Sequence, residues 1–192
     1  MNNMEPIPEF DANGCLPDGV YVCDEAVFRV RFVEAFQETR DDRAAICEGF
    51  IRWRQEAHRL GSIATQWVNG SFVEKRPVPP NDVDVVTFHD YTRFNGLEAG
   101  VREHVERLLG GREATKAAYH THAFLVLSCE SDHAYFVVFE HWRAYWRNWF
   151  GKTRDRPSPS RPALSGQRKG FVQLALGDAH LAPAISSERR AR

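Results

Sequence analysis

Apolar residues recur at helical spacing in the first third of the chain. The first such run starts at Asp24, a good helix N-cap, and continues through Val27, Phe28, Phe32 and Phe36. The residues before it are rich in Pro, Gly, Asp and Asn, which predicts an extended lead-in with turns.

A second apolar stripe predicts another helix immediately afterwards. Asp41 or Asp42 can cap this helix, and Leu60-Gly61 ends it. The stripe consists of Ile46, Phe50, Trp53 and Ala57.

Runs of β-branched and aromatic residues predict strands over 62–72, 82–88, 119–129 and 133–140, with a last short strand over 170–176. A helical stretch over about 96–109 separates the second strand from the third. The turn residues 130–132 predict a hairpin between the third and fourth strands, and hence a partly antiparallel sheet. We expect an α/β (α+β) fold with a mixed sheet flanked by helices.

The segment 141–151 contains three Trp and one Tyr and predicts a short helix that packs on the sheet through Trp142, Tyr145, Trp146 and Trp149. Base stacking is the alternative role for these rings. Residues 152–169 are basic and rich in Pro and Ser, which predicts a surface loop, and residues 177–192 are expected to be disordered. The chain thus predicts one domain over 1–176.

Composition narrows the class of protein. Apolar residues make up 43% and charged residues 27%, as in globular proteins, and the net charge of −1 gives no overall attraction to nucleic acid. The four cysteines form no C-x-x-C pair, the first residues lack a signal-peptide pattern, and the apolar runs are short. These features predict a cytoplasmic protein with reduced thiols and no membrane insertion.

The stretch WVNGSFVEKRPVPPNDVDVVTF carries the candidate chemistry. Gly70 and Ser71 follow a predicted strand, where a glycine turn and a hydroxyl can cradle a triphosphate. Asp82 and Asp84 are two apart on the next strand, so both carboxylates point the same way. Paired carboxylates suit Mg²⁺ or Mn²⁺, the ions that serve phosphoryl transfer.

This order of G-S, a loop and D-x-D resembles the nucleotidyltransferase superfamily, which includes DNA polymerase beta, kanamycin nucleotidyltransferase and the minimal nucleotidyltransferases of prokaryotes. LPDGVY, WRNWFG and RKGFVQLAL extend the resemblance to an uncharacterised bacterial family of that superfamily over most of residues 8–176. The resemblance implies transfer of a nucleoside monophosphate from an NTP to a hydroxyl, with Asp82 and Asp84 as metal ligands.

The superfamily has a third carboxylate on a later strand, and the matching position here is His122. Histidine can bind metal or act as a base, but its neutral nitrogen weakens Mg²⁺ binding. Glu130 and Asp132 are nearby acids that we place below His122 as site residues. His120 shares the predicted strand with His122, and the two could form a transition-metal site with His133 or His141; we predict no structural zinc.

Basic residues near the motif are candidates for holding the triphosphate. Arg168 and Lys169 lie at the end of the Pro-rich loop, and Lys116 lies at a helix end before the third strand. Surface solvation is the competing interpretation for all three residues.

Two functions remain open. The first is a metal-dependent nucleotidyltransferase whose acceptor is a protein side chain or a nucleic-acid end; the resemblance implies a setting in toxin-antitoxin or antiviral defence systems. The second is a degenerate nucleotidyltransferase fold that binds a nucleotide or a co-encoded partner protein, as an antitoxin does.

Overall fold

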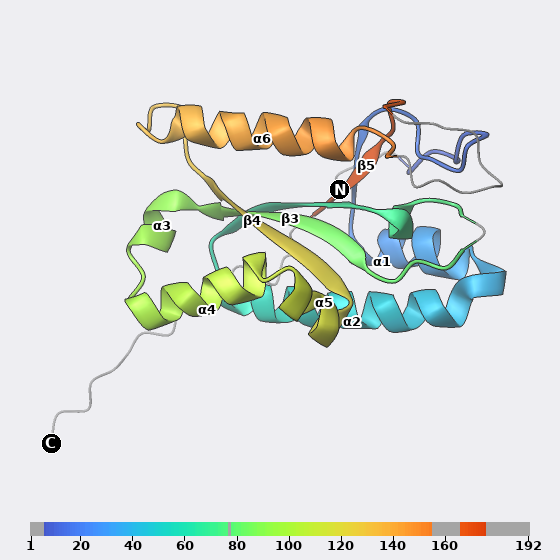
Figure 1. Cartoon of the computed structure of the whole chain (residues 1–192), viewed down its shortest axis with the longest axis horizontal. Helices are drawn as coiled ribbons and strands as arrows, with labels where there is room; N and C mark the ends of the chain where they lie inside the picture. Colours follow the sequence, from blue (N-terminus) through green and yellow to red (C-terminus); the bar gives the residue numbers. More distant parts are fainter. Residues whose placement is uncertain (1–5, 77, 155–165, 176–192) are drawn as a thin grey trace, which may run out of the picture.

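In a computed structural model, which describes residues 6–76, 78–154 and 166–175, the chain forms a five-stranded mixed sheet flanked by helices (Figure 1). The strand order is β1-β5-β2-β3-β4. β1 and β5 are parallel, as are β3 and β4, and β2 runs antiparallel to both of its neighbours. The predicted α+β class is confirmed. The strands are β1 Val20–Cys23, β2 Ile63–Asn69, β3 Val83–Asp90, β4 Thr121–Ser128 and β5 Phe171–Leu174.

Helices cover both faces of the sheet. α6 lies on one face, and α2, α4 and α5 lie on the other (Figure 1). None of the helices in the described ranges is long and apolar enough to cross a membrane. The helices are α1 Glu25–Arg29, α2 Arg40–Arg59, α3 Tyr91–Asn95, α4 Ala99–Gly110, α5 Glu113–Tyr119 and α6 Phe136–Phe150, with a π-helical turn Val30–Glu34 and 3-10 turns Gln37–Thr39 and Ser71–Val73.

The two N-terminal helical predictions are confirmed. The Asp24 carboxylate accepts a 2.7 Å hydrogen bond from the Val27 N–H and so caps α1. α2 begins at Arg40 and ends at Arg59, and its predicted apolar stripe is buried. The predicted cap is wrong, because Thr39 is the N-cap residue and Asp41 and Asp42 lie within the first turn. The lead-in also contains β1, which the turn-rich composition did not predict.

Alternation along the strands divides the core into two layers. Val83, Val85 and Ala123 pack with α2, whereas Val86 and Val126 pack with α6. The same alternation directs Asp84 and His122 to the α6 face, because each lies two positions from a residue of that layer.

The predicted strand over 133–140 and its hairpin are wrong. A turn over residues 129–135 leads into α6, which begins at Phe136. The short apolar run HAYFVVFE fits both periodicities, and it continues without a turn signal into the aromatic segment, so the whole stretch forms one helix. The sheet is partly antiparallel through β2 instead.

Two further predictions are wrong: the aromatic stripe that packs on the sheet, and the strand shared by His120 and His122. Trp146 packs against the sheet, but Trp142, Tyr145 and Trp149 are exposed, because the buried stripe of α6 runs through Trp146 and Phe150. The third strand begins at Thr121, so His120 is the left-handed C-cap of α5 and does not share a strand face with His122. Of the predicted loop, residues 155–165 lie outside the described ranges, as does the tail over 177–192.

A buried arginine links α2 to the loop that follows β2. The Arg43 guanidinium donates hydrogen bonds to the carbonyls of Phe32 (3.0 Å), Phe72 (2.7 Å) and Glu74 (2.9 Å). It also stacks 3.7 Å from the ring centre of Phe36. Burial lowers the pKa of Arg43 to about 10, so desolvation of this cation is balanced mainly by carbonyl oxygens.

We expect Arg43→Met to lower the free energy of unfolding by about 3 kcal/mol or more, because three buried carbonyls lose their donor. Urea unfolding followed by far-UV circular dichroism measures this loss. Arg40→Met, at an exposed position of the same helix, is the matched control and should change stability little. Equal stability of the two variants would contradict the anchoring role of Arg43.

Candidate functional site

Three polar side chains form a row across adjacent strands. In register, Asn69 of β2 pairs with Asp84 of β3, and Asp84 pairs with His122 of β4. Directly opposed residues have Cβ atoms about 5 Å apart, so the three side chains lie together on the α6 face. The row stands where β3 and β4 begin and β2 ends, beyond the apolar layer that α6 covers.

Asp84 and His122 are in direct contact. His122 Nδ1 lies 3.1 Å from Asp84 Oδ1. An ionised carboxylate can only accept a hydrogen bond, so Nδ1 carries the proton if this contact is a hydrogen bond. In the neutral form of the ring, Nε2 is then an acceptor. Nε2 lies 3.9 Å from Oε1 of Glu113, whose side chain is exposed. His122, whose side chain is 24% exposed, is therefore oriented by one carboxylate and has its other nitrogen on the side of Glu113.

Asp82 is bound by a cation from α5. Lys116 Nζ lies 2.8 Å from Asp82 Oδ2. The hydrogen bond to Asp82 is the main cause that raises the pKa of Lys116, and the charges of Asp82, Glu113 and Asp84 raise it further against partial desolvation. The surroundings of Asp82 and Asp84 thus stabilise positive charge.

Gly70 brings the turn after β2 against the Asp84 carboxylate. Its φ of 86° and ψ of −169° fall in a region that only glycine readily adopts. A Cβ added there would overlap Asp84 Oδ2. Ser71 follows directly and begins the 3-10 turn Ser71–Val73. The predicted proximity of the Gly70-Ser71 turn to Asp84 is therefore present.

The other predicted phosphate ligands are engaged elsewhere. Lys169 is buried and forms an ion pair with Glu74, which also pairs with Arg76. Arg168 forms an exposed ion pair with Asp18, with Nε 2.6 Å from the carboxylate. Lys169 therefore stabilises the loop after Gly70 through Glu74. Arg168 and Lys169 both have acidic protein partners in place of a phosphate.

Asn69 is a site residue that the sequence interpretation missed. Its Nδ2 donates to the carbonyl of Phe150, 2.9 Å away, at the end of α6. Its Oδ1 is buried and has no hydrogen-bond partner among the described residues. The only sequence signal is its position directly before Gly70. Glu113 was also missed, because it becomes a neighbour of His122 only through the packing of α5 on β4.

The metal-binding prediction rests on the chemistry of the donor atoms of Asp82 and Asp84. Across the described ranges, no group of three or more His, Cys, Asp or Glu side chains is arranged to hold a metal ion. Asp82 and Asp84 nevertheless supply oxygen donors, and the unpaired Oδ1 of Asn69 is a further oxygen in the same row. Asp82 and Asp84 are thus the residues that could hold a divalent ion, with phosphate oxygens and water completing its shell.

Comparison with known proteins gives one match. A family model described as "Family of unknown function (DUF6932)" matches residues 8–175. A search of curated proteins and a search of solved structures returned no match.

We expect Gly70→Ala to displace the Asp84 carboxylate and weaken its contact with His122, because a Cβ overlaps Oδ2. The His122 ring resonances in ¹H-¹⁵N NMR spectra should lose the signature of an Nδ1-protonated tautomer. The variant should also lose roughly 1–3 kcal/mol of stability from backbone strain.

Gly61→Ala is the matched control for this substitution. Gly61 also has a positive φ of 71°, but a Cβ there meets nothing within 4 Å. Its alanine variant should show the cost of backbone strain alone and leave the His122 resonances unchanged. If Gly70→Ala behaves like Gly61→Ala, the close approach of Gly70 to Asp84 has no role in the site.

Proposed function

We propose that this chain, which belongs to the DUF6932 family, is a metal-dependent nucleotidyltransferase that transfers a nucleoside monophosphate from an NTP to a hydroxyl group. The close approach of the Gly70 turn to Asp84 carries the proposal. Phosphoryl transfer requires a phosphate-binding turn next to carboxylates that hold a cation, and Asp82 precedes Asp84 by two residues.

Each residue of the site has a role in this reaction. Asp82 and Asp84 would hold Mg²⁺ or Mn²⁺, which when bound neutralises the charge of the phosphates. The backbone of Gly70 and the hydroxyl of Ser71 orient the β- and γ-phosphates. Lys116, which already neutralises Asp82 at 2.8 Å, adds a positive charge beside them.

His122 is suited to remove the proton of the attacking hydroxyl. With Nδ1–H donated to Asp84, the neutral ring presents Nε2 as the base. Asp84 orients the ring and stabilises the imidazolium that forms, as carboxylates do for catalytic histidines in general. This role explains how a histidine can stand at the place where the superfamily resemblance expects a third acid.

A second candidate function is favoured by the ion pairs of the site. Lys116 contacts Oδ2 of Asp82, and His122 contacts Oδ1 of Asp84, so each carboxylate already has a nitrogen partner. This arrangement suits a protein that binds a nucleotide or a co-encoded partner protein without transfer. Either function suits a cytoplasmic protein of a toxin-antitoxin or antiviral defence system. For the first function, the acceptor is a protein side chain or a nucleic-acid end.

We expect the double variant Asp82→Asn/Asp84→Asn to lose NMP transfer by roughly 100-fold or more, because amides do not replace carboxylates as ligands and charge stabilisers. The assay incubates each of the four α-³²P-labelled NTPs with the protein and Mg²⁺ or Mn²⁺, and measures labelled product and pyrophosphate. Asp41→Asn, which changes an exposed acid in the first turn of α2, is the control and should retain transfer. Full activity in the double variant would rule out the assigned site.

Thermal unfolding with each NTP separates the two candidate functions. Both predict that a nucleotide with Mg²⁺ or Mn²⁺ raises the melting temperature, because ligands that bind only the folded state stabilise it. Only the first predicts release of pyrophosphate. If no NTP raises the melting temperature and no pyrophosphate is released, both candidate functions are contradicted.

A further inference from the structure

A groove of about 410 Å³ lies beside the candidate site, along the outer edge of the sheet. Its walls come from α3, from α4, from β4, which is an edge strand, and from α6. Its lining includes two charged residues, Glu106 and Arg112, and five aromatic side chains: Phe94, Phe124, Tyr135, Trp142 and Trp146. Trp142 is 43% exposed, so a large part of its ring is available to a ligand.

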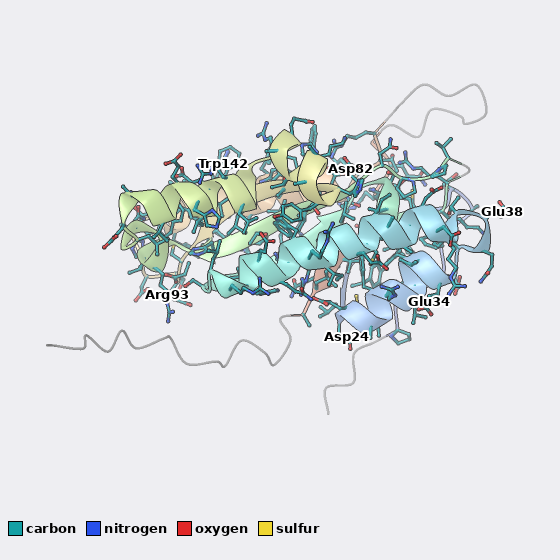
Figure 2. All side chains as sticks on the ribbon, turned by 90° about the horizontal axis from the view of Figure 1, so that it is seen from below. Asp24, Glu34, Glu38, Asp82, Arg93 and Trp142 are labelled. Carbon is teal, nitrogen blue, oxygen red and sulfur yellow. The ribbon has the colours of Figure 1, made fainter. Side chains whose placement is uncertain are left out.

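Phe124 connects the groove to the site. Its ring lies 4.6 Å from the ring of His122 and 4.4 Å from the ring of Trp146. Phe124 is only two residues after His122 on β4, so the groove begins about 7 Å from the proposed base. Asp82 and Trp142 lie along the same long edge of the molecule, beside α4 and α5 (Figure 2).

One exposed cation borders the groove next to the site. The Arg112 guanidinium lies 5.2 Å from the ring centre of Phe124, and among the described residues no acid lies within ion-pair distance of it. Its backbone φ of 35° is unusual for a residue other than glycine. An arginine in this place can bind a phosphate next to a stacked ring.

We propose that this groove binds the 3′-terminal nucleotides of a single-stranded nucleic acid, whose terminal hydroxyl is the acceptor of the transferred nucleotide. The inference rests on the proposed function of the site. The 3′ oxygen forms a bond to the α-phosphorus of the NTP, the bond from that phosphorus to the bridging oxygen breaks, and pyrophosphate leaves with the electron pair. The hydroxyl proton goes to Nε2 of His122.

The groove favours a nucleic acid over an extended peptide for two reasons. Aromatic rings stack on bases of any sequence, and Arg112 adds a contact for the backbone phosphate. A peptide strand would instead pair with the free edge of β4. Next to His122 that edge is closed, because the Ala123 N–H donates to Thr115 Oγ1 and the Ala123 carbonyl accepts from the Arg112 N–H, both at 3.4 Å.

The test measures binding without catalysis. Short single-stranded RNA and DNA oligonucleotides of mixed sequence carry a 5′ fluorescein and a 3′-deoxy end that cannot accept a nucleotide. Fluorescence anisotropy gives their Kd for the full chain without NTP. We expect Trp142→Ala to weaken binding by roughly ten-fold, the effect of losing one stacked base. Trp149→Ala removes an exposed Trp of α6 outside the groove and should bind like the wild type.

Arg112→Gln provides a second measurement that does not depend on the aromatic rings. It should weaken binding and reduce the salt dependence of the Kd, because one phosphate contact is lost. Arg143→Gln, at an exposed arginine of α6 outside the groove, is its control. Equal Kd values for Trp142→Ala, Arg112→Gln and their controls would overturn the proposal, as would the absence of oligonucleotide binding.

Failure of this inference is distinguishable from failure of the proposed function. If the oligonucleotides do not bind but α-³²P-labelled NTPs modify a protein, the site is a nucleotidyltransferase with a protein acceptor and the groove proposal is wrong. If they bind through Trp142 and Arg112 but a 3′-hydroxyl end is never extended with any NTP, the groove binds nucleic acid and the acceptor role is wrong.

Discussion

The absence of a side chain at Gly70 is the constraint on which the candidate site depends. The backbone of the turn lies against the Asp84 carboxylate, where a methyl group would overlap Oδ2. The turn also requires a φ of 86° at this position. Both the short distance to Asp84 and the backbone conformation therefore require glycine. Strand register then aligns Asp84 with Asn69 and His122, and the row follows from these two facts.

Buried cations hold this turn in place. Arg43 binds the carbonyls of Phe72 and Glu74 from the α2 side, and Lys169 binds the Glu74 carboxylate. A buried charge without a partner is costly, so each cation requires the loop to keep its shape. Arg43 and Lys169 therefore position the Gly70-Ser71 turn, although neither of them contacts the proposed substrates.

Much of the fold could be predicted from periodicity. The stripe of α2 is regular, and β2, β3 and β4 contain runs of β-branched and aromatic residues. The Gly70-Ser71 and Asp82-x-Asp84 motifs lie where these elements predict them. The strand predicted over 133–140 failed because an apolar run of eight residues fits either period. β1 is four residues long and was hidden in a segment rich in turn residues.

The remaining parts of the site depend on contacts between distant segments. Lys169 looked like a phosphate ligand because its sequence neighbours are basic, but the buried acid Glu74 lies 95 positions away in the chain. Arg112 and Phe124 become neighbours through the packing of the α4–α5 connection on β4. No local pattern specifies such pairs, so the groove could not be predicted from the sequence.

The position of β5 has a consequence for synthesis. β5 comes late in the chain but lies inside the sheet, between β1 and β2. Lys169, the partner of Glu74, lies two residues before its first residue, Phe171. In a nascent chain, β1 and β2 can therefore join the same sheet only after residues 171–174 leave the ribosome, and Glu74 gains its Lys169 partner at the same stage. The parts of the site that depend on Lys169 and β5 therefore form after the rest of the described sheet has been synthesised.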